Sequence, residues 1–300
     1  MNSKKCLVLG AAGFLGLHLC EGLAEANYAV RAFSRRSRQN VQGSEQIEWF
    51  IGDFNHPDDL DAALDGCEIV FHLISSTTPA SSNRDPVFDL QSNVGNTLQL
   101  LEKAKSHAVK KIIFVSSGGT VYGVPQQVPL TESMPTFPIC SYGISKLAIE
   151  KYLHLYSSLQ GLEYCVLRVA NLFGERQCLT KGQGAVGVFL DKALRGEPVE
   201  IWGDGEVVRD YVYVRDVVDA LIGAIAYSQE PRIFNIGSGI GRSLNQVLSS
   251  LEIVMDRPIK RIYREGRPVD VPINVLDISL AKQHLQWTPQ TEWMTALEQT

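Results

Sequence analysis

The chain has 300 residues, of which 45% are hydrophobic and 20% charged, a composition typical of a globular protein with a sizeable core. Its formal net charge of −5 gives no overall basic character of the kind that binds nucleic acid. The longest apolar runs, such as Ile112–Val115, are far shorter than the ~20 residues that cross a bilayer. We therefore expect neither a nucleic-acid partner nor a membrane span.

The cysteines and histidines are dispersed along the chain. No close pair has the spacing of metal ligands, and several thiols fall inside apolar runs, where a thiol behaves as a small hydrophobic group. We expect no metal site, and we expect reduced thiols in a cytoplasmic protein. The cysteines are Cys6, Cys20, Cys67, Cys140, Cys165 and Cys178.

Short β-branched runs alternate with helical patterns over the first two-thirds of the chain. This alternation predicts an α/β fold with a doubly wound parallel sheet, covered by helices on both faces. The expected strands are Cys6–Leu9, Ala29–Phe33, Ile47–Ile51, Ile69–Leu73, Ile112–Ser116 and Tyr164–Arg168. The expected helices are Leu15–Ala26, Pro57–Ala63, Asp89–Ser106 and Tyr142–Leu159.

After residue 170 the alternation loosens, and the loops become rich in glycine, proline and arginine. We interpret residues 1–170 as a Rossmann-like NAD(P)-binding domain and 171–300 mainly as a smaller α+β substrate-binding domain, with a segment near 205–237 returning to the first. The expected elements are strands Val199–Trp202 and Arg232–Ile236 and helices Val186–Arg195, Asp216–Tyr227 and Leu244–Met255.

A glycine-rich turn follows the first expected strand and opens the first expected helix. Gly10 suits the tight turn, Gly13 allows backbone amides to approach a pyrophosphate, and Gly16 lets helix and strand pack closely. The amides of Phe14 and Leu15 then lie at the helix amino terminus, which favours anions. Three glycines alone are compatible with an ordinary strand-to-helix turn, but this position predicts a dinucleotide site.

The end of the second strand leaves the choice between NAD and NADP open. A carboxylate is expected about 20 residues after the glycines, where it binds the adenosine ribose. The chain has Ser34, Arg35 and Arg36 there instead. An arginine at this place suits a 2′-phosphate and thus NADP, whereas arginines that stack on adenine or face solvent leave NAD as the cofactor.

Further cofactor contacts are expected where the third and fourth strands end. Asp53 and Phe54 follow the third strand, and Asp53 is placed to meet the adenine amino group. The alternative for Asp53 is a turn or helix-capping residue. Leu73 ends the fourth expected strand and is expected to line the same site.

A tyrosine and a lysine four residues apart, Tyr142 and Lys146, share one face of an expected helix. A free phenol titrates near pH 10, and an ammonium and a positively charged nicotinamide beside it both favour the phenolate. Chance pairs at this spacing are common. A hydroxyl-rich strand end, Ser116–Tyr122, is expected to reach the same pocket and favours a catalytic interpretation.

With these motifs the chain resembles the extended short-chain dehydrogenases, the family of the NAD-dependent epimerases and dehydratases, and most of all the UDP-glucose 4-epimerases. The resemblance runs over nearly the whole chain. Its motifs are the glycine turn, Ser116-Ser117-Gly118-Gly119-Thr120-Val121-Tyr122-Gly123, Tyr142-x-x-x-Lys146, Arg168-Val169-Ala170-Asn171, Gly203-Asp204-Gly205, Arg209-Asp210-Tyr211-Val212-Tyr213-Val214, Phe234-Asn235-Ile236-Gly237 and Arg267-Pro268-Val269-Asp270.

The resemblance implies a role for each residue of the catalytic motif. Tyr142 is the acid/base, and Lys146 tunes it and holds the nicotinamide ribose. Many relatives have a serine where this chain has Gly118, so the third catalytic hydroxyl comes from Ser117 or, as second choice, Thr120. Ser116 is expected to serve in packing at the strand end.

The resemblance also implies the residues that bind a nucleotide-diphosphate sugar. Asn171, Arg209 and Arg267 match positions that hold the diphosphate, to which a guanidinium fork is suited. The alternative for Arg209 is an ion pair with Asp210 or Asp216. Asn274 falls near a position that gates sugar size. Asn93 is expected to be structural, and a homodimer through the helices near Asp89–Ser106 and Tyr142–Leu159 follows from the family.

The same scaffold supports several reactions, and the residues narrow the choice. Dehydratases of this family have Asp-Glu after the catalytic hydroxyl residue and decarboxylases a glutamate, whereas this chain has Gly118-Gly119. Elimination is therefore disfavoured, and reversible oxidation of a nucleotide sugar by a 4-epimerase is expected. An NADPH-dependent keto-sugar reductase, favoured by Arg35 and Arg36, and a dinucleotide-binding sensor without activity are the alternatives.

Overall fold

The computed structural model describes residues 4–36, 44–107, 109–177, 184–266 and 271–300. Its centre is a seven-stranded sheet in the order β3-β2-β1-β4-β5-β6-β10, with every neighbouring pair parallel. This order is the doubly wound Rossmann arrangement extended by one strand. Its strands are β1 Lys5–Leu9, β2 Ala29–Ser34, β3 Ile47–Ile51, β4 Ile69–His72, β5 Lys111–Ser117, β6 Glu163–Val169 and β10 Ile233–Ile236.

Alternate residues of each central strand enter two separate hydrophobic cores. In β1, Cys6 and Val8 belong to one core and Leu7 and Leu9 to the other, and all four are fully buried. This follows from the period of two in a strand, since a sheet covered on both faces needs apolar side chains on both. The predicted α/β fold with a doubly wound parallel sheet is confirmed.

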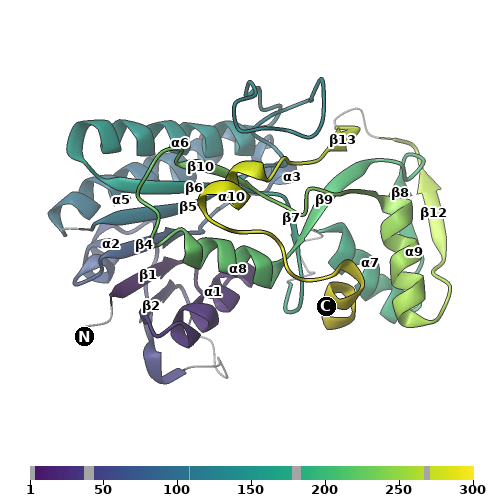
Figure 1. The fold of residues 1–300 in the computed structure, drawn as a ribbon, viewed down its shortest axis with the longest axis horizontal. Helices are drawn as coiled ribbons and strands as arrows, with labels where there is room; N and C mark the ends of the chain where they lie inside the picture. The colour runs from purple at the N-terminus through teal and green to yellow at the C-terminus, as the bar shows by residue number, and fades with distance from the viewer. Residues whose placement is uncertain (1–3, 37–43, 108, 178–183, 267–270) are drawn as a thin grey trace.

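Helices cover both faces of this sheet (Figure 1). One core contains side chains from α1 and α8, which pack against each other, and the second core contains side chains from α2, α5 and α6. The helices of this part are α1 Phe14–Glu25, α2 Pro57–Leu64, α3 Pro79–Ser82, α4 Pro86–Asp89, α5 Asn96–Ser106, α6 Ser141–Gln160, α8 Val214–Gly223 and α10 Ser279–His284.

The helix expected over Asp89–Ser106 differs from the prediction. It begins earlier, with α4, and passes through a π-helical stretch, Leu90–Gly95, before α5. Four side chains in or next to this stretch bond to carbonyls four residues back, which competes with the regular α-helical backbone pattern. They are Ser92 to Phe88, Asn93 to Asp89, Asn96 to Ser92 and Thr97 to Asn93.

The smaller part is built around β9, a strand that the sequence patterns did not reveal. β9 lies between β11 and β13 and also pairs with β7 near its carboxyl end, and β8 pairs with β12 in a separate two-stranded sheet. The helix predicted over Asp216–Tyr227 begins and ends earlier, as α8. The elements are β7 Asn171–Phe173, β8 Val199–Trp202, β9 Val208–Tyr213, β11 Gly241–Ser243, β12 Arg261–Arg264, β13 Ile273–Asn274, α7 Ala185–Leu194, α9 Leu244–Met255 and α11 Trp293–Gln299.

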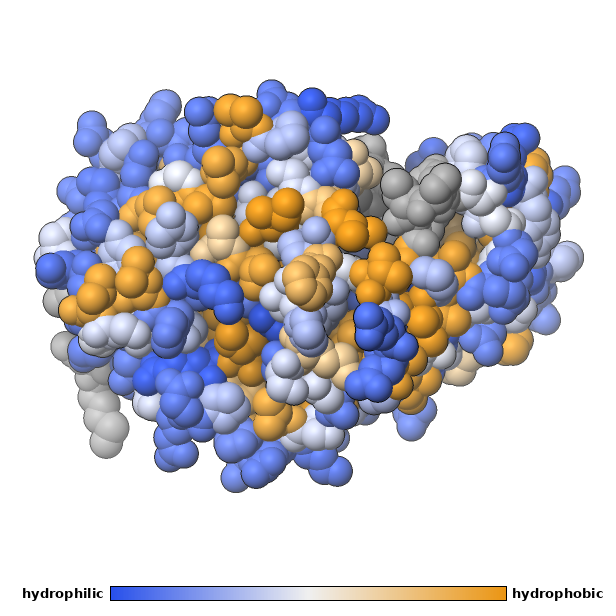
Figure 2. All heavy atoms as spheres, turned by 90° about the horizontal axis from the view of Figure 1, so that it is seen from above, coloured by the Kyte–Doolittle hydropathy of each residue, from blue (hydrophilic) through white to orange (hydrophobic). Residues whose placement is uncertain are grey.

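The two parts meet at the carboxyl ends of the central strands. The chain leaves β6 at Val169 and enters β7 at Asn171, so the smaller part begins directly beside this edge (Figure 1). Figure 2 shows a notch in the outline where the larger and smaller parts meet. Ligands of open α/β sheets bind outside this edge, so the fold places the candidate site here.

No helix within the described ranges is long and apolar enough to span a bilayer. The 20-residue helix α6 carries Lys146, Glu150 and Lys151, which illustrates why length alone does not qualify it.

Candidate active site

The glycine turn after β1 has the close backbone contacts that a dinucleotide cradle requires. Gly10 has a φ of +91°, and its amide donates to the carbonyl of Phe33 at the end of β2 (3.2 Å). A Cβ on Gly16 would lie 2.2 Å from the Gly10 oxygen, so only glycine fits. Gly13 caps α1 without a side-chain hydrogen bond, which leaves the first-turn amides, including those of Phe14 and Leu15, directed at this turn.

The end of β2 has no carboxylate at the expected ribose position. Ser34 Oγ donates to the Arg36 carbonyl (2.7 Å) and accepts from the Arg36 amide (3.1 Å), which closes a tight turn. Arg35 and Arg36 are both exposed. Arg31 in the same strand serves the fold, since it donates to the carbonyls of Ala63 and Asp65 at the end of α2.

Asp53 after β3 is engaged in a local turn. Its carboxylate accepts from the backbone amide (2.9 Å) and the side chain (2.6 Å) of Asn55, and these bonds hold the pKa of Asp53 below its ordinary value. Phe54 is buried against the ring of His72 (5.3 Å between centroids), and the Leu73 amide donates to Leu9 at the end of β1. These contacts agree with the alternative interpretation, in which Asp53 is a turn residue.

Tyr142 and Lys146 lie on the first two turns of α6, beside the end of β5. Lys146 Nζ lies 5.6 Å from the centroid of the Tyr142 ring and donates to the Val115 carbonyl (2.9 Å). Burial lowers the pKa of Lys146 to about 8, while Glu150 and Asp89 act in the opposite direction. Burial raises the pKa of the Tyr142 phenol, so the protein alone holds this group protonated at neutral pH.

The turn after β5 places both candidate hydroxyl residues against α6. The Ser117 carbonyl accepts from the Thr120 amide (3.3 Å), and Thr120 Oγ1 is buried with no hydrogen-bond partner among the described residues. A Cβ on Gly143, the residue after Tyr142, would lie 2.9 Å from the Thr120 oxygen. The structure therefore places the Ser117–Thr120 turn beside the start of α6, where Tyr142 precedes Gly143.

A leucine from the smaller part takes the place of a side chain at Gly118. A Cβ there would lie 2.5 Å from Leu276 Cδ1. Asn274 Nδ2 donates to the Gly118 carbonyl (3.2 Å), and Asn274 Oδ1 is buried without a partner in the described part of the chain. The departure at Gly118 thus has a packing cause.

The small sheet brings the other expected substrate residues into one layer. Asn171 lies opposite Tyr211, Asn274 lies opposite Arg209, and Asn171 Nδ2 donates to the Asp210 carbonyl (3.1 Å). Arg209 donates to the carbonyls of Val208 (2.9 Å) and Val271 (2.6 Å). Arg267 lies outside the described residues.

The two aspartates considered as ion-pair partners of Arg209 have other hydrogen-bond partners. Asp210 is fully buried and accepts from the amides of Ser238 (2.7 Å) and Gly239 (3.1 Å). Asp216 accepts from the amide of Gln290 (3.0 Å). Both carboxylates thus fix loops of the chain.

A buried network behind the site was not found from the sequence. Glu150 forms an ion pair with Arg168 (2.6 Å), and Ser116 donates its hydroxyl to Glu150. Ser116 is buried at the end of β5, as expected, and its hydroxyl is also part of this network. Arg168 continues the network to Tyr122 (3.0 Å), and no local pattern along the chain links these separated residues.

Asn93 has the structural position expected of it. Its side chain accepts from the Ser76 amide (2.9 Å) and donates to Asp89 (2.9 and 3.1 Å). Asn93 thereby ties the π-helical stretch to the loop after β4.

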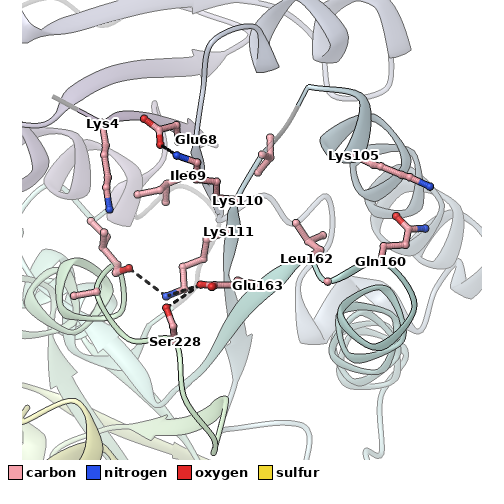
Figure 3. A pocket seen from close by; sticks show the side chains of 14 residues that line it. Lys4, Glu68, Ile69, Lys105, Lys110, Lys111, Gln160, Leu162, Glu163 and Ser228 are labelled. Atoms are coloured by element: carbon pink, nitrogen blue, oxygen red, sulfur yellow. Dashed lines mark hydrogen bonds and ion pairs between the residues drawn. The ribbon is translucent and has the colours of Figure 1, made fainter. Parts of the chain in front are cut away.

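A cavity of 510 Å³ lies at the opposite edge of the sheet, among the amino ends of β4, β5 and β6 (Figure 3). Four of its six charged side chains, Glu68, Lys110, Lys111 and Glu163, already have partners in the fold. Lys111 donates to the carbonyls of Ala224 (2.9 Å) and Ile225 (3.1 Å) at the end of α8, Ser228 donates to Glu163 (2.9 Å), and Lys110 pairs with Glu68. This cavity is therefore separate from the candidate site. Among the described residues no group of acidic, histidine or cysteine side chains could hold a metal ion.

Comparisons with known proteins give one consistent family. The model of the NAD dependent epimerase/dehydratase family matches residues 6–237. The chain is 35% identical over 288 residues to a putative UDP-glucose 4-epimerase of Methanocaldococcus jannaschii, covering 95% of this chain and 93% of that protein. The structure of UDP-glucose 4-epimerase from Thermotoga maritima with UDP-glucose is similar with a TM-score of 0.93 and 37% identity, covering 99% of this chain and 97% of that one.

A relative named for a different sugar is equally similar in fold. The UDP-N-acetylglucosamine 4-epimerase from Methanobrevibacter ruminantium, in complex with UDP-N-acetylmuramic acid, has a TM-score of 0.92 at 28% identity and covers 100% of this chain and 97% of that one. The fold therefore does not select the sugar.

Proposed function

The chain belongs to the NAD-dependent epimerase/dehydratase family, and we propose that it is a self-contained 4-epimerase of a UDP-hexose of the glucose/galactose type. The observation that carries the proposal is the Tyr142–Lys146 pair beside the Ser117–Thr120 turn at the carboxyl edge of the sheet. Gly118 and Gly119 supply no carboxylate there for elimination, which favours reversible oxidation.

The proposed cofactor is NAD. Gly10, Gly13 and Gly16 would form the pyrophosphate cradle, and a Cβ on Gly16 would collide with the Gly10 oxygen, 2.2 Å away. The amides of Phe14 and Leu15 would meet the phosphates. Ser34, Asp53, Phe54 and Leu73 would line the adenosine side, at the ends of the next three strands or the loops that follow them. When bound, the nicotinamide takes up a hydride from the sugar carbon and returns it.

Arg35 keeps NADP as the alternative cofactor. Arg35 directly follows Ser34 in the chain and is exposed, so its guanidinium could contact a 2′-phosphate. Comparing the binding of NAD and NADP to the wild type and to Arg35→Ala decides between the two. A loss of NADP affinity alone would assign Arg35 to the 2′-phosphate.

The residues of α6 would perform the proton transfer. Tyr142 Oη would accept the proton of the sugar 4-hydroxyl as the C4 hydrogen leaves with its electron pair, and would give the proton back to the carbonyl oxygen on return. Lys146, with its ammonium near the ring, would favour the phenolate. The hydroxyl of Ser117 or of Thr120 would orient the sugar hydroxyl, and Thr120 Oγ1 is buried with no hydrogen-bond partner among the described residues.

Asn171, Arg209 and Arg267 would hold the diphosphate while the sugar turns over between the two hydride transfers. Asn171 and Arg209 lie in the small sheet at the site. Asn274 lies in the same sheet and would limit the size of the sugar, since its side chain is fixed to Gly118. The side chain of Asn274 is of modest size and would leave room for an N-acetyl group on the sugar. Refusal of both UDP-N-acetylhexosamines by an enzyme active on UDP-hexoses would contradict this assignment.

The test of the function is turnover without added cofactor. The purified protein is expected to release NAD on denaturation and to interconvert UDP-glucose and UDP-galactose. Tyr142→Phe should abolish turnover and retain NAD, since only the ionisable hydroxyl is removed. Protein that binds no nicotinamide and acts only with added NADPH on a keto sugar would instead be a reductase, and protein that binds NAD tightly without turnover would be a sensor.

We also infer a homodimer that packs through α6 and the helical segment near Asp89–Ser106, which begins with α4. Large hydrophobic side chains are exposed on both, among them Phe88, Ile144 and Leu159, with exposed fractions of 52%, 54% and 72%. Sedimentation should give twice the chain mass, and Leu159→Glu with Ile144→Glu should give the monomer.

A further inference from the structure

Asp89, the last residue of α4, is a fully buried carboxylate held by uncharged donors. It accepts hydrogen bonds from Ser141 Oγ (2.8 Å), Ser145 Oγ (2.6 Å), Asn93 Nδ2 (3.1 Å) and the Thr77 hydroxyl. No lysine, arginine or histidine in the described part of the chain lies within ion-pair distance of it. A buried charge without a cationic partner is costly, and such charges concentrate at functional sites.

The hydrogen bonds of Asp89 join three segments that surround the candidate site. Ser141 and Ser145 flank Tyr142 on the first turns of α6. Thr77 belongs to the loop that follows β4 at the carboxyl edge of the sheet, and Asn93 holds the same loop through the Ser76 amide. One carboxylate therefore connects this loop to the helical turn that carries the proposed acid/base.

The charges near Tyr142 and Lys146 identify Asp89 as the unbalanced one. Glu150 lies one turn beyond Lys146 on α6 and raises the pKa of Lys146 more than Asp89 does, but its carboxylate is paired with the Arg168 guanidinium from β6. Burial holds the pKa of His72 at the end of β4 at about 3, so its ring is neutral. Burial raises the pKa of the Cys140 thiol before α6, so it is uncharged near neutral pH.

We propose that Asp89 is a positioning residue of the reaction, which fixes the turn around Tyr142 and adds negative charge near Lys146. Only the kinetic consequence of this inference rests on the proposed function. The hydroxyl donors position the carboxylate. Its negative charge stabilises the charged form of Lys146, which burial disfavours because the ammonium loses its hydration.

Asp89→Asn tests the charge, because it keeps the shape and the hydroxyl groups around it can rotate to accept. Asp89 raises the pKa of both Tyr142 and Lys146, so its neutralisation lowers both. Because both pKa values should fall, both limbs of the kcat–pH profile should move to lower pH by about one unit. At a fixed pH on the alkaline limb this is roughly a tenfold loss of activity.

Two control variants separate charge from structure. Asp216→Asn neutralises another buried carboxylate, at the start of α8, which is hydrogen-bonded to Gln290 and Thr291. It should leave both limbs in place. Ser145→Ala removes one donor but keeps the charge, and it should lower kcat without moving either limb. An unshifted profile in Asp89→Asn, or an equal shift in Asp216→Asn, overturns the proposal.

A second readout does not need turnover. The Lys146 ammonium is titrated by NMR in protein without substrate, using lysine labelled with ¹³C at the ε carbon, and its signal is assigned by its absence in Lys146→Met. A midpoint near 8 in the wild type and a lower one in Asp89→Asn supports the proposal, and equal midpoints overturn it. If Asp89→Asn does not fold, Asp89→Ser replaces it in both measurements. Wild-type protein without epimerase activity would refute the proposed function, while this titration would still decide the role of Asp89.

Discussion

Replacing Gly118 by alanine tests whether the turn after β5 and the segment around Leu276 are packed as one unit. The added Cβ would lie 2.5 Å from Leu276 Cδ1 and 3.1 Å from the Arg168 carbonyl. Gly118 is not in the left-handed region, so a loss of stability would come from crowding. Leu276 is 1% exposed and has little room to move, and overpacking of this kind costs about 1–3 kcal/mol of unfolding free energy.

The assay is urea unfolding of Gly118→Ala, Leu276→Ala and the double variant, followed by tryptophan fluorescence. Leu276→Ala alone should cost about 2–5 kcal/mol through the cavity it leaves. The shortened side chain also makes room for the new methyl group, so the double variant should lose about 1–3 kcal/mol less than the sum of the single losses.

Gly119→Ala is the matched control, because its Cβ would meet only Ser117 Oγ, at 3.9 Å. It should unfold close to the wild-type midpoint. Additive losses in the double variant, or a Gly118→Ala protein as stable as Gly119→Ala, would refute the packing argument.

Two further variants examine the cofactor turn and the opposite edge of the sheet. Gly16→Ala should abolish retention of NAD, because its Cβ would lie 2.2 Å from the Gly10 oxygen. Gly95→Ala is the control, because its Cβ meets nothing within 4 Å, and it should retain NAD. Bound NAD in both variants would contradict the proposed pyrophosphate cradle. Lys111→Met should lose about 1–3 kcal/mol of unfolding free energy, because Lys111 binds the carbonyls of Ala224 and Ile225, and it should keep the kcat of the wild type. Lys110→Met, at an exposed ion pair with Glu68, should lose less than about 1 kcal/mol, and an equal loss in the two lysine variants would count against this account of Lys111.

Elements with a strong period could be predicted from the sequence. β3, β8 and α9 begin and end where the patterns placed them, at Ile47–Ile51, Val199–Trp202 and Leu244–Met255. In these segments apolar residues repeat at the strand or helix period and turn residues bound them, so local preference and burial agree.

The small sheet was missed for physical reasons. β7, β11 and β13 have three, three and two residues, too few to show a period. β9 carries Arg209 and Asp210 and therefore lacks the apolar signature of a strand, although Asp210 is buried and satisfied by loop amides. Such partners come from distant parts of the chain and leave no local signal.

In the candidate site, too, a contact within one helix could be predicted from the sequence, whereas contacts between distant residues could not. The four-residue spacing of Tyr142 and Lys146 predicted that they share a helix face, and the structure places Lys146 Nζ 5.6 Å from the Tyr142 ring. The contacts of Asp89 with Ser141 and Ser145 join residues more than 50 positions apart, which spacing cannot reveal. The filling of the Gly118 position by Leu276 is likewise a tertiary contact.

The most direct test of the central claim is the fate of the hydrogen at C4 of the sugar. UDP-glucose carrying deuterium at C4 is incubated with the purified protein and no added cofactor, and the UDP-galactose formed is analysed by mass spectrometry and NMR. Transient oxidation with return of the same hydride predicts full retention of deuterium at C4. Loss of the label to solvent, or product formation only with added NADPH, would contradict the self-contained epimerase.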